Sequence, residues 1–140
     1  MASEKTLTFP SEIENIHLAE QLIDDVCTNH QVREEFYGEI LISITEAVNN
    51  AIVHGNRLDP NKKVTIHFHE DGKNMFFTVE DEGPGFDYTS LPDPTSPENI
   101  EKPHGRGVFL MRQLADTCDF EDGGRMVKLS FDVIGKSIEV

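Results

Sequence analysis

The chain has 140 residues, and its 26 acidic side chains outnumber its 12 lysines and arginines, which gives a formal net charge of −14. One core can bury roughly two thirds of the surface that an unfolded chain of this length exposes, so we expect a single domain over residues 1–140 without disulfides or structural metals. The negative charge repels a phosphate backbone or an anionic membrane and attracts basic proteins. We therefore expect no direct nucleic acid and no membrane. The charge is compatible with a basic protein partner, but many soluble proteins are acidic for solubility alone, and that remains the default interpretation.

The two cysteines, Cys27 and Cys118, stand in apolar segments without Cys-x-x-Cys spacing, and no basic secretory leader precedes them. They are expected to be small core residues in a reducing compartment. No run approaches the ~18 consecutive apolar residues of a membrane-spanning helix. The expected location is the cytoplasm.

Two helices are predicted in the first half of the chain. The first begins at a capping box, Ser11 with Glu14 three residues later, and has apolar residues at helical spacing over residues 16–26. The second covers residues 34–54, with Gly55 as its C-terminal cap. Its buried stripe is expected to consist of Phe36, Ile40, Ile44, Ala47, Val48 and Ala51.

Strands are predicted where apolar and polar residues alternate or where short apolar runs lie between turns. Asp71-Gly72 favours a hairpin turn, and Asp122-Gly123-Gly124 favours a second turn near the end of the chain. The predicted strands cover residues 6–9, 64–69, 75–80, 120–121 and 127–133.

Residues 86–103 have no periodicity and contain four prolines, which predicts a long irregular loop of the kind that often serves as a lid. A third helix is predicted at residues 107–115, with Phe109, Leu110 and Leu114 as its apolar residues. Together the elements predict an α+β two-layer sandwich. Its sheet is expected to be mixed but mainly antiparallel, with the helices on one face.

Three polar residues share one face of the second predicted helix. Glu46, Asn50 and His54 follow one another at intervals of four, so their side chains project from neighbouring turns and can converge on one ligand. The amide oxygen of Asn50 is a hard ligand that suits Mg²⁺ bridging substrate phosphates, and Glu46 is then free to act as a base in phosphoryl transfer. The competing interpretation is a set of solvated polar residues on a helix surface.

Asp81 ends an apolar strand and is followed by Gly83 and Gly85. A carboxylate at this position can accept a hydrogen bond from the exocyclic amine of adenine, which selects adenine over guanine. The glycines allow the backbone to turn sharply and to approach a base or ribose closely. An ordinary acidic turn is the competing interpretation.

Gly105 and Gly107 flank Arg106 where the third helix is predicted to start. The first amide groups and the positive dipole end of a helix suit an anion such as a phosphate chain. Lys102, His104 and Arg106 add cationic or hydrogen-bonding groups nearby, and a basic residue on the lid can stabilise charge on a transferring phosphoryl group. Each of these residues equally fits a solvated loop position.

In this order, the three motifs resemble the GHKL ATP-binding superfamily, named for gyrase, heat-shock chaperone, histidine kinase and mismatch-repair ATPases, and more closely its small anti-sigma factor serine kinases. Residues 46–56 resemble the N box, 81–85 the first glycine box, about 86–104 the lid and 104–112 the second glycine box. The resemblance covers nearly the whole chain. It implies the Bergerat fold, with ATP and Mg²⁺ as cofactors.

Carried over by position, the resemblance implies that Glu46 is the general base, Asn50 the magnesium ligand and Asp81 the acid that reads adenine. Where the family often has Gly-Thr before its last strand, this chain has Arg125 after two glycines, so a threonine contact near the base is not carried over. The other cofactor-binding positions are His54, Gly83, Gly85, Lys102, Gly105, Arg106, Gly107 and Val108.

The resemblance further implies a partner switch in the regulation of transcription. The ATP-bound protein, a homodimer, binds a sigma factor and phosphorylates a serine on an anti-anti-sigma protein of the STAS type. Two alternatives stay open. One is a nucleotide-gated adaptor without kinase activity. The other is a catalytic fragment of a histidine kinase, although 140 residues leave no room for a helical segment with a phosphoacceptor histidine.

Overall fold

The computed structural model describes residues 4–85 and 103–134, with only the backbone at 103–106. Five strands form one sheet in the order β1-β2-β3-β5-β4, and all four pairs of neighbours are antiparallel. Short turns join β2 to β3 and β4 to β5, and strands joined in this way pair antiparallel, so the sheet in the described chain is not mixed. The strands are β1 (Glu4–Pro10), β2 (Lys63–Glu70), β3 (Asn74–Glu80), β4 (Thr117–Glu121) and β5 (Met126–Asp132).

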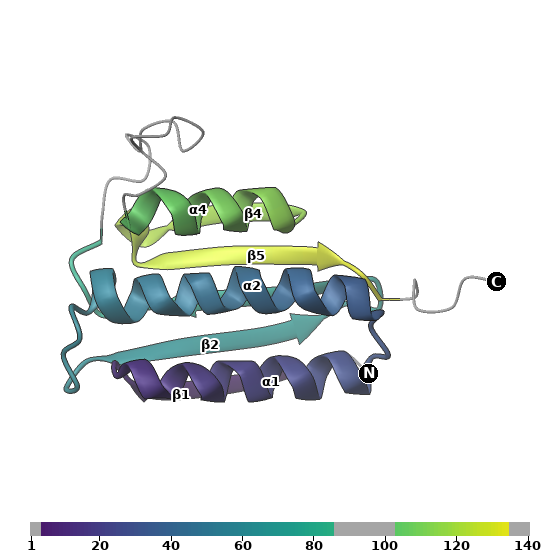
Figure 1. Ribbon diagram of the computed structural model, residues 1–140, viewed down its shortest axis with the longest axis horizontal. Coiled ribbons are helices and arrows are strands. Elements are labelled where there is room, and N and C mark those ends of the chain that lie inside the picture. Colours follow the sequence, from purple (N-terminus) through teal and green to yellow (C-terminus); the bar gives the residue numbers. More distant parts are fainter. Residues whose placement is uncertain (1–3, 86–102, 135–140) are drawn as a thin grey trace.

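Three helices of the described chain cover one face of this sheet, which confirms the predicted two-layer α+β fold (Figure 1). They are α1 (Ile16–Asn29), α2 (Glu34–Asn50) and α4 (Pro103–Leu114). None of the helices in the described ranges is long and apolar enough to cross a bilayer. The described residues also form two 3₁₀ turns, η1 (Ile13–Asn15) and η4 (Asp122–Gly124), and one π-helical turn, η2 (Ala51–Gly55).

The core lies between α2 and the centre of the sheet. On β2, Val64, Ile66 and Phe68 are almost fully buried, as the alternation predicts. Ring centroids lie 5.1 Å apart for Phe68 and Phe77, and 6.0 Å apart for Phe77 and Phe131, so aromatic packing joins β2, β3 and β5. Of the two cysteines, Cys27 is buried and Cys118 is partly buried.

The predicted capping box at Ser11 does not form. The Ser11 hydroxyl donates to the Lys62 carbonyl at 2.7 Å and accepts from Asn56 Nδ2 at 2.7 Å. The chain enters α1 through η1 instead, whose N-cap, Glu12, makes no side-chain cap bond. Ser11 does not cap the helix because its hydroxyl forms hydrogen bonds with residues that are distant in the sequence.

The second predicted helix is wrong at its C-terminal end. Regular α-helix stops at Asn50, and the π-helical turn η2 follows, in which the Asn56 amide donates to the Ala51 carbonyl at 2.8 Å. Gly55 does not adopt a left-handed φ, so it is not the glycine cap that the sequence suggests. The third helix also differs from its prediction, because α4 begins at Pro103 rather than at 107.

Candidate functional site

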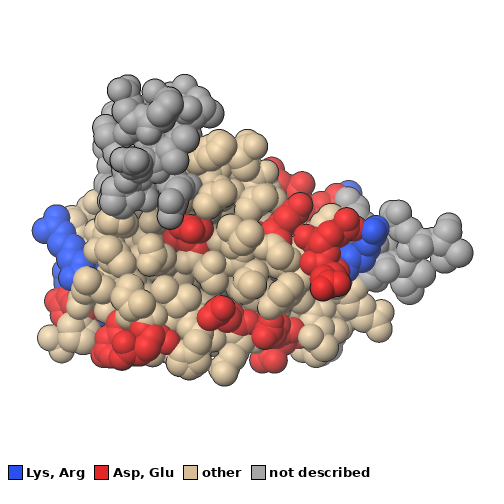
Figure 2. Space-filling view, in the orientation of Figure 1, with Lys and Arg blue, Asp and Glu red and all other residues tan. Residues whose placement is uncertain are grey.

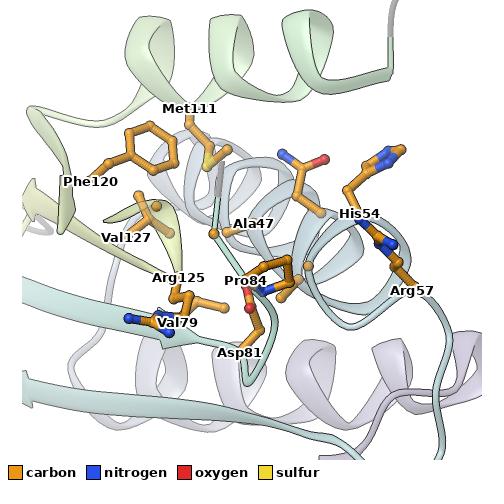
Figure 3. Close-up of a pocket in the computed structure, with 15 residues that line it drawn as sticks. Ala47, His54, Arg57, Val79, Asp81, Pro84, Met111, Phe120, Arg125 and Val127 are labelled. Carbon is orange, nitrogen blue, oxygen red and sulfur yellow. The ribbon is translucent and has the colours of Figure 1, made fainter. Parts of the chain in front are cut away.

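A pocket of about 180 Å³ lies between α2, the inner face of β3 and β5, and the loop at residues 81–85. In Figure 3, Asp81 and Pro84 stand on one side of this pocket, and Met111 and Phe120 stand on the other. Its lining therefore combines residues from the first half of the chain with residues from α4, β4 and β5. The N-box and first-glycine-box segments of the sequence meet here.

Asp81 brings a carboxylate to this pocket directly after β3. Its backbone N–H donates to the Arg125 carbonyl at 2.9 Å, and its Oδ1 accepts the Gly83 amide at 2.8 Å. Burial raises the pKa of Asp81, and the Gly83 hydrogen bond and the positive charge of Arg125 partly offset the rise. With Oδ1 held by the loop, Oδ2 is the acceptor that can receive a donor from a ligand.

Three glycines allow very close approaches around Asp81. A Cβ added to Gly83 would lie 1.9 Å from the Gly55 carbonyl oxygen, and one added to Gly85 would lie 2.1 Å from the Gly123 carbonyl oxygen. Gly85 also has a φ of +81°, in the left-handed region. A Cβ at Gly55 would lie 2.4 Å from Asp81 Oδ2. No larger residue fits these positions without a shift of the backbone or of the carboxylate.

On the α2 side of the site, Asn50 Oδ1 is buried and has no hydrogen-bond partner among the described residues. Gly107 of α4 packs against this side chain, since a Cβ there would lie 2.9 Å from Asn50 Nδ2 and 3.2 Å from Glu46 Oε2. An unpaired buried oxygen costs about 1–3 kcal/mol until a ligand bonds to it. The geometry therefore brings Glu46, Asn50 and the second glycine motif together around an acceptor that suits a hard cation.

His54 and Arg57 line the same pocket, as Figure 3 shows. Burial lowers the pKa of His54, which favours its neutral ring, able both to donate and to accept a hydrogen bond. Arg57 was not predicted as a site residue. Its φ of +54° lies in the left-handed region, which few residues other than glycine adopt.

The apolar wall of the pocket is the part of the site that the sequence did not reveal. Val79 and Val127 are register partners on β3 and β5, and Phe120 is the partner of Val127 on β4. An apolar slot beside a carboxylate suits a flat heteroaromatic base with an exocyclic donor. The apolar lining residues include Ala47, Ala51, Val79, Met111, Phe120 and Val127.

Arg125 borders the pocket at the position where the family that the sequence resembles often has a threonine (Figure 3). Its Nε donates to the Asp122 carbonyl at 3.2 Å, and its Nη2 lies 3.1 Å from Asp122 Oδ1. Asp122, Gly123 and Gly124 all have positive φ, so the turn before β5 is tight. The guanidinium group of Arg125, which bonds to Asp122 in this turn, therefore stands beside Asp81 where a threonine would place a hydroxyl group.

The remaining predicted site residues lie elsewhere or outside the description. Val108 is buried in the core, with 2% of its surface exposed, and Gly83 borders an adjoining groove that shares Pro84 with the pocket. Lys102 and the predicted lid up to residue 102 lie outside the described residues. At Gly105 and Arg106 the structure describes only the backbone, within the first turns of α4.

Comparison with known proteins identifies a family model and several curated relatives. Residues 9–131 match the model of the histidine kinase-like ATPase domain. The chain is 31% identical to the anti-sigma F factor of Shouchella clausii over 114 residues, which cover 79% of this chain and 77% of the relative. It is 29% identical to the anti-sigma F factor of Oceanobacillus iheyensis over 122 residues (85% and 83%), and 28% identical to that of Clostridium perfringens over 123 residues (85% and 86%).

Proposed function

Because this chain belongs to the histidine kinase-like ATPase family, within the GHKL superfamily, we propose that it is an anti-sigma factor with ATP-dependent serine kinase activity. It binds a sigma factor and phosphorylates a serine on an anti-anti-sigma protein of the STAS type. The observation that carries the proposal is that one pocket is lined both by the Asp81 carboxylate and by Asn50, whose buried Oδ1 has no hydrogen-bond partner in the part of the chain that the structure describes. The Asp81 carboxylate can accept a hydrogen bond from the amine of a base. The Asn50 oxygen can bind a metal ion that is coordinated by the phosphate chain.

In this proposal, the adenine lies in the apolar slot and donates its exocyclic amine to Asp81 Oδ2. The slot between Val79 and Met111 has the apolar character that suits a flat ring, because both side chains are buried and apolar. His54 and Arg57 then border the sugar or phosphates with hydrogen-bond donors. Arg125 stands near the base and supplies a cationic donor where a threonine would supply a neutral hydroxyl.

Mg²⁺ fits the residues on the α2 side. Asn50 Oδ1 would hold the ion, because it is a buried acceptor to which none of the described residues bonds. When bound, Mg²⁺ neutralises phosphate charge during transfer. The close packing of Gly107 on Asn50 and Glu46 leaves backbone, rather than a side chain, facing the phosphates.

Glu46 acts as the general base. Its carboxylate accepts the proton of the substrate serine hydroxyl while the serine oxygen bonds to the γ-phosphorus. The bond from that phosphorus to the β–γ bridging oxygen breaks, and ADP departs with the bonding electrons. Glu46 suits this part because its Oε2 lies close to the Gly107 position, next to Asn50.

The proposed partners fit the charge of the helical face. α1 and α2 contain no lysine or arginine, and Figure 2 shows many acidic side chains on the face that carries them. Such a surface attracts basic regions of a partner protein. The exposed acidic residues on these helices are Glu20, Asp24, Asp25, Glu34, Glu35 and Glu39.

We further propose that residues 1–140 act as one domain, that the protein works as a homodimer, and that it acts in the cytoplasm, where sigma factors bind RNA polymerase. Transcription is then regulated through protein contact. Sedimentation velocity with and without ATP tests the dimer directly. A monomer at all concentrations would contradict that part of the proposal.

The test of function is to immobilise the protein with Mg²⁺ and ATP, capture partners from an extract of its own cells, and map their phosphorylation sites by mass spectrometry. We expect a sigma factor and a small protein phosphorylated on serine. With Glu46→Gln, transfer should fall by about 100-fold or more, the usual contribution of a general base. Glu4→Gln, at an exposed glutamate on β1 that lies outside both the pocket lining and the acidic surface of α1 and α2, is the control and should leave transfer unchanged.

Capture of a sigma factor with no phosphoserine on any partner would replace the kinase with a nucleotide-gated adaptor. Undiminished phosphorylation by Glu46→Gln would remove Glu46 from the chemistry. Phosphate on a histidine of this chain, recognisable because it is acid-labile, would favour the histidine-kinase alternative.

A further inference from the structure

Gly55 lies at the end of η2, and neither helix capping nor its backbone conformation requires a glycine there. Its φ is outside the left-handed region, so any residue could adopt its backbone conformation. Gly38, in the middle of α2, is a useful comparison. It does not have a positive φ either, and a Cβ there would meet nothing within 4 Å. Gly55 is different because of what lies next to it.

The neighbour of Gly55 is the Asp81 carboxylate. A Cβ at Gly55 would lie 2.4 Å from Oδ2, 2.5 Å from Cγ and 2.8 Å from Oδ1 of Asp81. These distances are shorter than any van der Waals contact, so a methyl group would have to displace the carboxylate. Because Cγ and both oxygens lie within this range, the whole carboxylate would have to move, which would disturb the hydrogen bond that Oδ1 accepts from the Gly83 amide.

The backbone at Gly55 is fixed from its other side. Gly83 packs on the Gly55 carbonyl so closely that a Cβ at Gly83 would lie 1.9 Å from that oxygen. The next residue, Asn56, is 1% exposed, and its side chain bonds to Ser11, Lys63 and Glu82. Gly55 consequently cannot retreat to make room for a side chain.

The π-helical turn brings Gly55 into this position. The amide of Asn56 donates to Ala51, five residues back, instead of four as in an α-helix. The extra residue in the turn rotates the chain, so that Gly55 is the residue that faces Asp81 at the end of β3. π-Helical turns are rare in proteins, and single turns of this kind are frequent at functional sites.

We infer that Gly55 is a specificity-determining position of the nucleotide site, because its bare Cα sets the depth at which Asp81 presents Oδ2 to the 6-amino group of the base. This inference rests on the proposed ATP site. Gly55 is a positioning residue that acts through Asp81. A side chain at Gly55 should therefore reduce the selectivity for a base with a 6-amino group more than it reduces the affinity for nucleotides in general.

The test compares the affinity for ADP with that for purine riboside diphosphate, which lacks the 6-amino group, by isothermal titration calorimetry. The wild-type protein should prefer ADP by about tenfold or more, as expected for one hydrogen bond to a charged acceptor. Gly55→Ala should lose most of this preference, mainly through weaker ADP binding. Gly38→Ala is the matched control and should retain it.

A double-mutant cycle separates positioning from general damage. In an Asp81→Asn background, Gly55→Ala should leave the ratio of the two affinities unchanged, because the reader of the amino group is already altered. Equal loss of both nucleotides in Gly55→Ala, or an unchanged ADP preference, would overturn the inference while leaving the ATP site in place. A wild-type protein that bound neither nucleotide would overturn the proposed function and the inference together.

Thermal melting supplies a second readout if Gly55→Ala folds poorly. Asp81→Ala removes the group that the new methyl strikes, so it should raise the melting temperature of Gly55→Ala more than it changes that of the wild-type protein. The absence of such rescue would contradict the contact argument. Gly38→Ala should show no coupling to Asp81→Ala.

Discussion

Gly107 of α4 lies against Asn50 of α2 so closely that a Cβ at Gly107 would come within 2.9 Å of the amide nitrogen and 3.2 Å of the amide oxygen. The contact joins two motifs that are far apart in the sequence. It also means that the position of α4 affects how a ligand reaches the Asn50 oxygen, to which no described residue bonds. A glycine here is required by packing between helices rather than by a special backbone angle.

Gly107→Ala is therefore expected to slow phosphoryl transfer by roughly 100-fold, because the new methyl group would push the Asn50 amide and the Glu46 carboxylate out of register with the substrate. Initial rates with a captured STAS-type substrate measure the effect. Gly38→Ala, on the open side of α2, should leave the rate unchanged. A normal rate in Gly107→Ala would show that the contact does not position the two side chains.

Asn50→Ala is expected to abolish the increase in ADP affinity that Mg²⁺ gives, while binding in the presence of a chelator should change little. The reason is that Oδ1 is a buried acceptor without a partner among the described residues. Calorimetry with and without Mg²⁺ measures this difference. Asn49→Ala, one position earlier on the same helix and outside the pocket lining, is the control. A variant at Asn50 that kept the full response to Mg²⁺ would remove it from the metal site.

The sequence predicts the layers of this protein well because burial on one face leaves a period in the chain. Val64, Ile66 and Phe68 alternate with polar residues, and the structure buries all three. The fourfold spacing of Glu46 and Asn50 likewise predicts a shared helix face, and both lie beside Gly107. Structural features that follow from the spacing of residues along the chain could therefore be predicted from the sequence.

Features that depend on contacts between distant segments were not recoverable. Ser11 looks like a helix cap, yet it bonds to Lys62 and Asn56 in a buried site. The apolar wall of the pocket depends on the pairing of β3 with β5, which no local pattern specifies. Gly55 reads as a helix terminator, and its close approach to Asp81 appears only when the chain is folded.

Asp81→Asn is expected to raise the melting temperature near neutral pH and to weaken ADP binding at the same time. Burial holds the pKa of Asp81 above its ordinary value of 3.8, so the folded protein binds the proton more tightly than the unfolded chain does. Stability from protonation is thus fully present below pH 3.8 and is lost as pH rises through the folded pKa. The ionised, partly desolvated carboxylate therefore opposes folding at neutral pH.

Differential scanning calorimetry over a pH series checks this sign. The gain in melting temperature from Asp81→Asn should shrink as the pH falls through the folded pKa, because the wild-type carboxyl then becomes neutral too. Asp25→Asn, at an exposed position on α1, should give no comparable trend. A gain from Asp81→Asn that grew on acidification would contradict the raised pKa.

Asn56→Ala is expected to lower the free energy of unfolding by about 3 kcal/mol, because it leaves several buried hydrogen-bonding groups without partners. The Asn56 side chain donates to Ser11 Oγ at 2.7 Å and to the Lys63 carbonyl at 3.0 Å, and it accepts the Glu82 amide at 2.8 Å. Urea unfolding measures the loss, with Asn61→Ala at an exposed position as the control. If both variants lost the same small amount, this network would not be what fastens the end of η2 to β2 and to the loop after β3.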